Sequence, residues 1–261
     1  MTGPVILIEK VIVSYRDTIA LRDVSLSVSR GEFIGVIGPN GAGKTTLLTV
    51  VNGLTRVVKG RVEVLGRDAN GRARHELRKQ VGYVAQVAAV DKRMPISARE
   101  VVMIGRYGRL GLLHRPSRHD WQLVDEALEM VGMAHLARRP VGHLSGGEQQ
   151  RIALARCLAQ EPEIFLLDEP IASLDWKAQT EILELVKSIH KERRLTTLFI
   201  THNFDDLPHA FDRVVLMKNG QITGDGPPDE LISTESLSTL YDLPPSAVEE
   251  RRPHVHTGRG H

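Results

Sequence analysis

One stretch of the chain, residues 38–45, has the residue types and spacing of a phosphate-binding loop. It reads Gly-Pro-Asn-Gly-Ala-Gly-Lys-Thr, follows an apolar segment at Glu32–Ile37 that predicts a strand, and precedes a predicted helix from Lys44 to Asn52. Glycines let backbone N–H groups converge on phosphate oxygens, and a helix N-terminus favours an anion. We expect Lys44 to reach the β- and γ-phosphates and Thr45 to bind Mg²⁺. A chance glycine-rich turn is the alternative, and the strand-loop-helix context disfavours it.

Two acidic residues end a second apolar segment. Ile164–Leu167 predicts a buried strand, and Asp168 and Glu169 follow it directly. Such a strand would deliver Asp168 beside the phosphate loop, where it can hold Mg²⁺ directly or through water. Glu169, one residue further on, is suited to orient and deprotonate an attacking water. Acids in the first turn of a following helix are the alternative reading of this pair.

The composition is that of an ordinary globular protein. The chain has 261 residues, with 34 Lys and Arg against 32 Asp and Glu, a balance that gives no support to nucleic-acid binding. Its single cysteine excludes an intrachain disulfide. No apolar run is long enough to span a bilayer, and no secretory signal is visible, so we expect a cytosolic protein.

Strand-like and helix-like patterns alternate along the chain, which predicts a largely parallel sheet covered on both faces. An Asn-Gly pair within Lys218–Gln221 predicts a hairpin, and a helical block at about residues 88–160 predicts an inserted lobe. Further strands are predicted at Val5–Val13, Val24–Ser29, Arg61–Leu65, Val81–Ala85, Thr197–Thr201 and Val214–Met217. Helices are predicted at Ala98–Ile104, Asp120–Val131, Glu148–Leu158 and Ala178–His190.

The segment Leu144–Arg151 reads Leu-Ser-Gly-Gly-Glu-Gln-Gln-Arg and lies between the phosphate loop and the acidic pair. It resembles the signature segment of ATP-binding cassette (ABC) ATPases, although an ordinary capped helix N-terminus is the alternative. The resemblance covers about Val5 to Ile232. It implies a P-loop ATPase core with a mostly parallel sheet, an N-terminal antiparallel β subdomain and an inserted α-helical subdomain. The cassette would then occupy residues 1–240, followed by a flexible tail over 241–261.

The resemblance also implies a site shared by two copies of the chain, in which the signature of one copy caps the ATP held by the other. Catalytic roles fall to Lys44, Gln86, Glu169 and His202, and Mg²⁺ binding to Thr45, Gln86 and Asp168. Tyr15 would stack on adenine. ATP would be bound by Tyr15, Gly38, Pro39, Asn40, Gly41, Ala42, Gly43, Lys44, Thr45 and Thr46 of one copy, and by Ser145, Gly146, Gly147 and Glu148 of the other.

Each of these assignments has a structural alternative. Tyr15, Gln86 and His202 could be surface or strand-end residues, and Ser173–Asp175, which would cross the dimer interface, could be a helix cap. The chain also departs from the family pattern at two places. Asn203 follows His202 where an acid is commoner, and Ala85 stands where proline is common; neither change removes a catalytic group.

A single cassette without membrane spans resembles the ATPase subunit of a bacterial importer. Residues 101–116 and the segment Pro170–Asp175 are similar to those of cassettes for manganese, zinc or iron. The resemblance implies a peripheral protein on the cytoplasmic face of the inner membrane, partnered by permease subunits, indirectly by a solute-binding protein, and by no nucleic acid. The alternatives are a siderophore, haem or cobalamin importer and, outside transport, a soluble cassette ATPase or a regulatory nucleotide-binding module. The single phosphate loop disfavours a soluble cassette ATPase, and Glu169 and His202 oppose a module without hydrolysis.

Two charged stretches remain. Asp91–His119 carries seven Lys and Arg against two acids, and we expect this basic face to dock the permease near anionic lipid; a solvated helical face is the alternative. Charge reversal at Arg106 and Arg109 would test the docking. The tail contains His254, His256 and His261, too few for a closed metal site, so a neutral, disordered end is the favoured reading.

Overall fold

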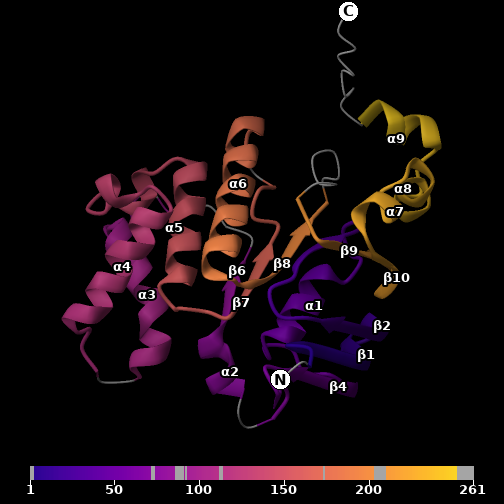
Figure 1. Ribbon diagram of the computed structural model, residues 1–261, viewed down its shortest axis with the longest axis horizontal. Helices are drawn as coiled ribbons and strands as arrows, with labels where there is room; N and C mark the ends of the chain where they lie inside the picture. The colour runs from indigo at the N-terminus through magenta and orange to yellow at the C-terminus, as the bar shows by residue number, and fades with distance from the viewer. Residues whose placement is uncertain are drawn as a thin grey trace, which may run out of the picture.

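The computed structural model contains two β-sheets with helices packed around them (Figure 1). It describes residues 3–71, 74–85, 91, 93–111, 114–172, 174–202 and 210–251. The predicted α/β class is confirmed, with a mostly parallel central sheet, an antiparallel N-terminal sheet and an inserted helical lobe.

The N-terminal sheet is antiparallel, in the order β2-β1-β4-β5. Its strands are β1 (Ile6–Tyr15), β2 (Thr18–Val28), β4 (Lys59–Val64) and β5 (Arg67–Asp68). Burial alternates along β1, so one face of this sheet covers the core and the other meets solvent. β2 begins before the predicted Val24 because a tight hairpin joins it to β1. The turn between β1 and β2 contains Arg16 at φ 52°. This left-handed conformation usually occurs at glycine or asparagine, so the sequence gives no signal for the turn.

The central sheet has the order β10-β9-β3-β8-β7-β6, in which only β10 is antiparallel to its neighbour. The Asn219-Gly220 hairpin between β9 and β10 is confirmed, with φ of 50° and 78°. The strands are β3 (Phe33–Ile37), β6 (Val81–Val84), β7 (Ile164–Asp168), β8 (Thr196–Thr201), β9 (Arg213–Lys218) and β10 (Gln221–Gly226).

The register of β3, β8 and β7 decides where the site forms. These three strands are parallel neighbours, with Ile37 opposite Thr201 and Asp168 opposite Ile200. All residues of the three strands are buried, as expected for parallel strands covered on both faces. The segments that follow them therefore leave the sheet side by side at its carboxyl edge.

Two hydrophobic clusters cover the two faces of the central sheet. On β3, Ile34 and Val36 join the cluster shared with α1 and the N-terminal sheet, whereas Phe33 and Ile37 join the cluster shared with α6 and the helical lobe. This alternation places α1 and α6 on opposite faces. The helices outside the lobe and the C-terminal unit are α1 (Lys44–Val51), α2 (Arg74–Gln80) and α6 (Trp176–Arg193).

The helical lobe stands beside the sheet and consists of α3, α4 and α5 (Figure 1). α3 crosses α5 closely, since a Cβ added to Gly105 would lie 1.9 Å from the backbone oxygen of Arg156. Each helix of the lobe begins with a serine capping box, which satisfies two of its free N–H groups. Their bounds are α3 (Ala98–Leu110), α4 (Arg118–Met130) and α5 (Gly146–Leu158), with 3-10 turns at Ala134–Leu136 and Val141–His143.

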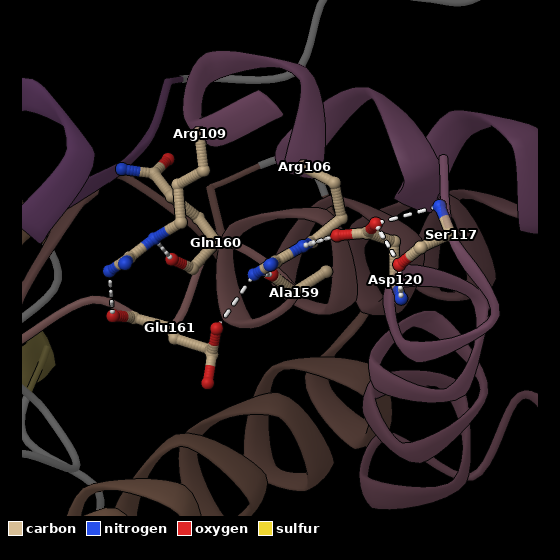
Figure 2. A network of polar contacts seen from close by, with 7 residues as sticks. All are labelled: Arg106, Arg109, Ser117, Asp120, Ala159, Gln160 and Glu161. Atoms are coloured by element: carbon tan, nitrogen blue, oxygen red, sulfur yellow. Dashed lines mark hydrogen bonds and ion pairs between the residues drawn. The ribbon is translucent and has the colours of Figure 1, made fainter. Parts of the chain in front are cut away.

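Arg106 ties the three helices of this lobe together (Figure 2). Its guanidinium is buried and lies 3.1 Å from Asp120 at the start of α4. It also donates to the backbone oxygen of Ala159, just after α5, at 2.8 Å and to the carboxylate of Glu161 at 2.7 Å. Arg109, one turn further along α3, donates to the backbone oxygens of residues 160 and 161.

These contacts correct the test proposed for the basic face. Arg106 is an internal cation that balances two acids, and Arg109 closes the end of α5, so charge reversal at either would disturb the lobe itself. Apart from Arg109, the exposed cations among the described residues of the stretch are Arg93, Arg115 and Arg118. Among the described residues, we therefore expect any docking by this face to use those positions.

The C-terminal unit lies beside β9 and β10, at the edge of the central sheet opposite the helical lobe (Figure 1). It consists of α7 (Pro228–Leu231), α8 (Thr234–Tyr241) and α9 (Pro245–Arg251). The expectation of a flexible tail from residue 241 is corrected here, because α9 occupies its first part and Val248 is fully buried against the core. Tail residues 252–261, with His254, His256 and His261, lie outside the described residues.

Candidate active site

The loop between β3 and α1 curls around the side chain of Lys44. Its Nζ donates to the backbone oxygen of Gly38 at 2.8 Å and to that of Pro39 at 3.1 Å. A Cβ at Gly38 would lie 2.1 Å from a backbone oxygen of β9, so the loop can only pass here as glycine. Gly43 begins α1 at φ 95°, a left-handed value that favours glycine. The loop thus combines a helix N-terminus with one buried cation, the arrangement that binds phosphate.

Asp168, at the end of β7, accepts a hydroxyl hydrogen bond on each carboxylate oxygen. Thr45 Oγ1 donates to Oδ1 at 3.1 Å, and the Tyr83 hydroxyl donates to Oδ2 at 3.0 Å. Burial raises the pKa of Asp168 above its ordinary value, although both hydroxyls oppose the change. Burial and the neighbouring carboxylate also raise the pKa of Tyr83, so its phenol remains a donor. Asp168 is therefore a carboxylate held in one orientation, and a nearby cation would stabilise its charged form.

Glu169 lies between a cation and an imidazole. Its Oε1 is 3.7 Å from Lys44 Nζ, and its Oε2 is 3.4 Å from His202 Nδ1. Burial lowers the pKa of Lys44, while the charges of Glu169 and Asp168 act to raise it. The backbone of Glu169 has φ 49°, a conformation that non-glycine residues adopt rarely and often at functional sites. The carboxylate is thereby held near the loop, in a position from which it can orient a water.

Tyr15, at the end of β1, is connected to α1 by a chain of hydroxyl groups. Its phenol shares a hydrogen bond with Thr55 Oγ1 at 2.9 Å, and Thr55 donates to Thr49 at 2.9 Å. Thr49 in turn donates to the backbone oxygen of Thr46 at 3.0 Å. The tyrosine is half exposed, so its ring is fixed at the hydroxyl end and offers a face for stacking.

The signature segment lies elsewhere in the chain. Ser145 and Glu148 form the capping box of α5, and the backbone N–H of Ser145 holds the pKa of Glu148 low. A Cβ at Gly146 would meet Leu174, and one at Gly147 would meet Ala178, both near the start of α6 and at ordinary contact distances of 3.5 and 3.6 Å. No atom of the phosphate loop lies within 4 Å of either position.

The structure brings together three sets of predicted residues and leaves one apart. The loop 38–46, the acidic pair and His202 gather at the carboxyl edge of β3, β7 and β8, whereas the signature segment starts α5 in the helical lobe. Gln86 and Ser173 lie outside the described residues. Sequence reasoning does not assign Tyr83 to the site. A tyrosine on the strand before Gln86 is the signal that could have found it.

The part of the chain that the structure describes holds neither a ready-made metal centre nor a membrane-spanning helix. No cluster of three or more His, Cys, Asp or Glu side chains among these residues could hold a metal ion. No helix in the same part of the chain has the length and apolar character needed to cross a membrane.

Known proteins share both the sequence and the fold. The family model for the ABC transporter matches residues 21–172, more than half of the chain. The chain belongs to the ABC transporter family. This cassette is 38% identical over 234 residues to the manganese transport system ATP-binding protein MntB of Bacillus subtilis, covering 90% of the chain and 91% of the relative. Its identity to the zinc transport system ATP-binding protein TroB of Treponema pallidum is 35% over 240 residues, with coverages of 92% and 88%.

A solved relative gives the same fold. The cassette matches a dimeric ATP-binding cassette in a post-hydrolysis state, bound to ADP and phosphate, with a TM-score of 0.71 and 28% identity. The match covers 85% of this chain and 98% of the other. The predicted family and the ATPase activity coupled to transport are confirmed by these likenesses.

Proposed function

We propose that this cassette is the ATP-hydrolysing subunit of a bacterial importer for a metal ion, manganese, zinc or iron, and that it works at the cytoplasmic face of the membrane with a separate permease. The named transport roles of the manganese and zinc relatives support the cargo class. One observation carries the chemistry. Glu169, which follows β7, lies within ion-pair distance of both Lys44 and His202, which follow the two strands β3 and β8.

The donor set around Asp168 fits Mg²⁺. Asp168 and Thr45 offer hard oxygen ligands of the kind that Mg²⁺ prefers, and the burial that raises the pKa of Asp168 makes a bound cation favourable there. Bound together with ATP, Mg²⁺ would neutralise phosphate charge. Tyr83 holds the second oxygen of Asp168 and so fixes the direction in which the first one faces.

The residues of this chain then divide the work of hydrolysis. Lys44, held by two carbonyl oxygens of its own loop, is placed to offset charge on the terminal phosphates. Glu169 orients the attacking water and takes up its proton. His202 donates a hydrogen bond to the phosphoryl group as its charge grows. Catalysis in this scheme is a matter of position and electrostatics.

The signature segment serves a second copy of the chain. Gly146 and Gly147 have room for a Cβ within their own chain, so the fold alone does not require glycine there. Their bare backbone N–H groups at the start of α5 suit an anion that approaches from outside. The proposal is that ATP bound in the loop of one copy contacts Ser145 and Gly147 of the other.

The sharpest test compares Glu169→Gln with Gly147→Ala. Glu169→Gln should bind ATP, fail to hydrolyse it, and sediment as a dimer when ATP is present. Gly147→Ala should fold with an unchanged melting temperature, since its Cβ meets only ordinary contacts, yet should neither dimerise nor hydrolyse ATP. Full ATPase activity in Glu169→Gln would overturn the role given to Glu169, and wild-type dimerisation of Gly147→Ala would overturn the shared site.

The cargo needs an experiment of its own, because a cassette for a siderophore, haem or cobalamin would use the same ATP site. A strain that lacks this chain should lose cellular manganese, zinc or iron. The wild-type gene, and not Glu169→Gln, should restore the metal. The metals should be supplied as free ions, because siderophores and haem also carry iron; a deletion strain with normal metal content under these conditions, but with an uptake defect when a siderophore, haem or cobalamin is supplied, would instead favour the chelate importers. Reversal of the exposed Arg93 and Arg115 should release the permease without loss of nucleotide binding.

A further inference from the structure

Within the described residues, a hydrogen bond connects the C-terminal unit to the active site. The hydroxyl of Tyr241, the last residue of α8, donates to the backbone oxygen of His202 at 3.1 Å. The two residues are 39 positions apart, and Tyr241 lies outside the segment 21–172 that matches the family model. We propose that Tyr241 is a positioning residue for His202, through which α8 sets the activity of the ATPase site. This inference rests on the role proposed for His202 in hydrolysis.

Such a restraint matters because the side chain of His202 is only partly enclosed. The side chain is 47% exposed, and its partner among the described residues is Glu169 at 3.4 Å. Its backbone has just left β8, where Thr201 makes the last pairing of the strand. The direction of a backbone carbonyl is coupled to the torsions of its own residue, so fixing that oxygen restricts where the imidazole can lie. Tyr241 supplies this restraint through the backbone oxygen of His202.

Tyr241 can act as a fixed point because α8 is well anchored. Leu237 and Leu240 are buried in the core cluster that also contains residues of β9. Lys218, at the end of β9, donates to the backbone oxygen of Thr239 at 2.6 Å and pairs with Asp242 at 2.7 Å. The last turn of the helix is therefore tied to the sheet by both apolar and charged contacts.

This arrangement predicts a specific kinetic signature. ATP binding depends on the phosphate loop and on Tyr15, where Lys44 bonds within its own loop and Tyr15 bonds to Thr55. The position of His202 matters when charge develops on the phosphoryl group, which is a property of the transition state. Loss of the Tyr241 hydroxyl should therefore lower kcat and leave the affinity for ATP unchanged.

The test is Tyr241→Phe in the full-length chain, with Ser233→Ala as the matched control. Phenylalanine keeps the ring and removes the hydroxyl that donates to His202, so kcat should fall by about fivefold, the order expected for loss of a hydrogen bond of this kind. Ser233 caps the other end of α8, and its loss weakens the helix while leaving the Tyr241 hydroxyl in place. Ser233→Ala should lower the melting temperature more than Tyr241→Phe does, with kcat near the wild-type value.

A double-mutant cycle with His202→Ala completes the test. It needs a phosphate-release assay sensitive enough to measure the residual ATPase activity of His202→Ala. If Tyr241 acts through His202, Tyr241→Phe should have no effect in the His202→Ala background. An equal fall in both backgrounds, an unchanged kcat in the single variant, or an equal fall in Ser233→Ala would overturn the inference. Full activity in His202→Ala would overturn the role of His202 itself. If His202→Ala is inactive but Tyr241→Phe has the wild-type kcat, the role of His202 stands and the inference about Tyr241 fails.

Discussion

Replacing Arg106 by leucine should show that the helical lobe is held together by one buried cation. The substitution keeps an apolar stem of similar reach and removes the guanidinium. Three contacts disappear, to the carboxylates of Asp120 and Glu161 and to the backbone oxygen of Ala159. Arg109→Leu is the matched control, because Arg109 lies one turn along the same helix and is exposed.

The expected magnitude follows from what each partner retains. When Arg106 is lost, Asp120 still accepts hydrogen bonds from the N–H and the hydroxyl of Ser117, at 2.8 and 2.6 Å. The buried charge of Asp120 therefore loses only part of its compensation. Removal of one member of a buried pair costs about 3–5 kcal/mol, and the retained capping box places this case near the lower end, at about 3 kcal/mol. The carbonyl partners of Arg109 can accept from water instead, so its loss should cost about 0.5 kcal/mol.

Urea unfolding followed by circular dichroism measures both variants in the same way. With a slope of about 3 kcal/mol per molar urea, Arg106→Leu should lower the midpoint by about 1 M and Arg109→Leu by much less. ATP affinity of the folded Arg106→Leu protein should stay near the wild-type value, because Lys44 and its loop lie outside the lobe. Equal midpoints for the two variants would refute the assignment of Arg106 as an internal tie, and would return it to the exposed basic face.

Four further substitutions test the site. Asp168→Asn should raise the melting temperature of the nucleotide-free protein relative to wild type, because burial raises the pKa of Asp168. The difference should grow as the pH rises from the unfolded pKa through the raised folded pKa, where the wild type loses stability; a pH-independent difference would contradict this. Tyr83→Phe should raise the Mg²⁺ concentration for half-maximal ATPase activity by about tenfold, which a magnesium titration checks. Gly38→Ala should abolish ATP binding in a nucleotide titration, since its Cβ would lie 2.1 Å from a backbone oxygen. Gly41 has φ 80° and open space around the position of a Cβ. Gly41→Ala should therefore lower the free energy of unfolding by about 1 kcal/mol and should still bind ATP.

The parts of the fold that the sequence predicts well are those in which a local pattern and the packing agree. β3 and β7 are short apolar runs that end in chemically distinct residues, Gly38 and Asp168. Parallel strands with both faces covered leave little choice of position for such runs. The residue pattern therefore predicts that the loop and the acidic pair each follow a buried strand, whereas the order β3-β8-β7 that brings them together is known from the structure.

The sequence pattern could not predict that a cation is neutralised by acids far away in the sequence. A count of charges over Asp91–His119 cannot reveal that Arg106 is buried, because its partners Asp120 and Glu161 lie 14 and 55 residues away. The turn at Arg16 likewise carries no glycine signal, so the pattern places the start of β2 too late. Tyr241 belongs to the same class, since nothing in its own neighbourhood of the sequence points to His202.

The charges in the site also explain how one cluster can serve both binding and catalysis. Lys44 is 3.7 Å from Glu169 and is held by carbonyl oxygens at shorter distances, so its cation is already fixed where phosphate would meet it. An arriving phosphate competes with Glu169 for that cation, because both are anions and Lys44 is buried. In the proposed scheme, Glu169 would give up part of its attraction to Lys44 and keep its contact with His202, 3.4 Å away, while it orients the water. The left-handed backbone of Glu169 keeps the carboxylate at this junction, so in the proposed scheme the binding of phosphate to Lys44 would free Glu169 to act as the base.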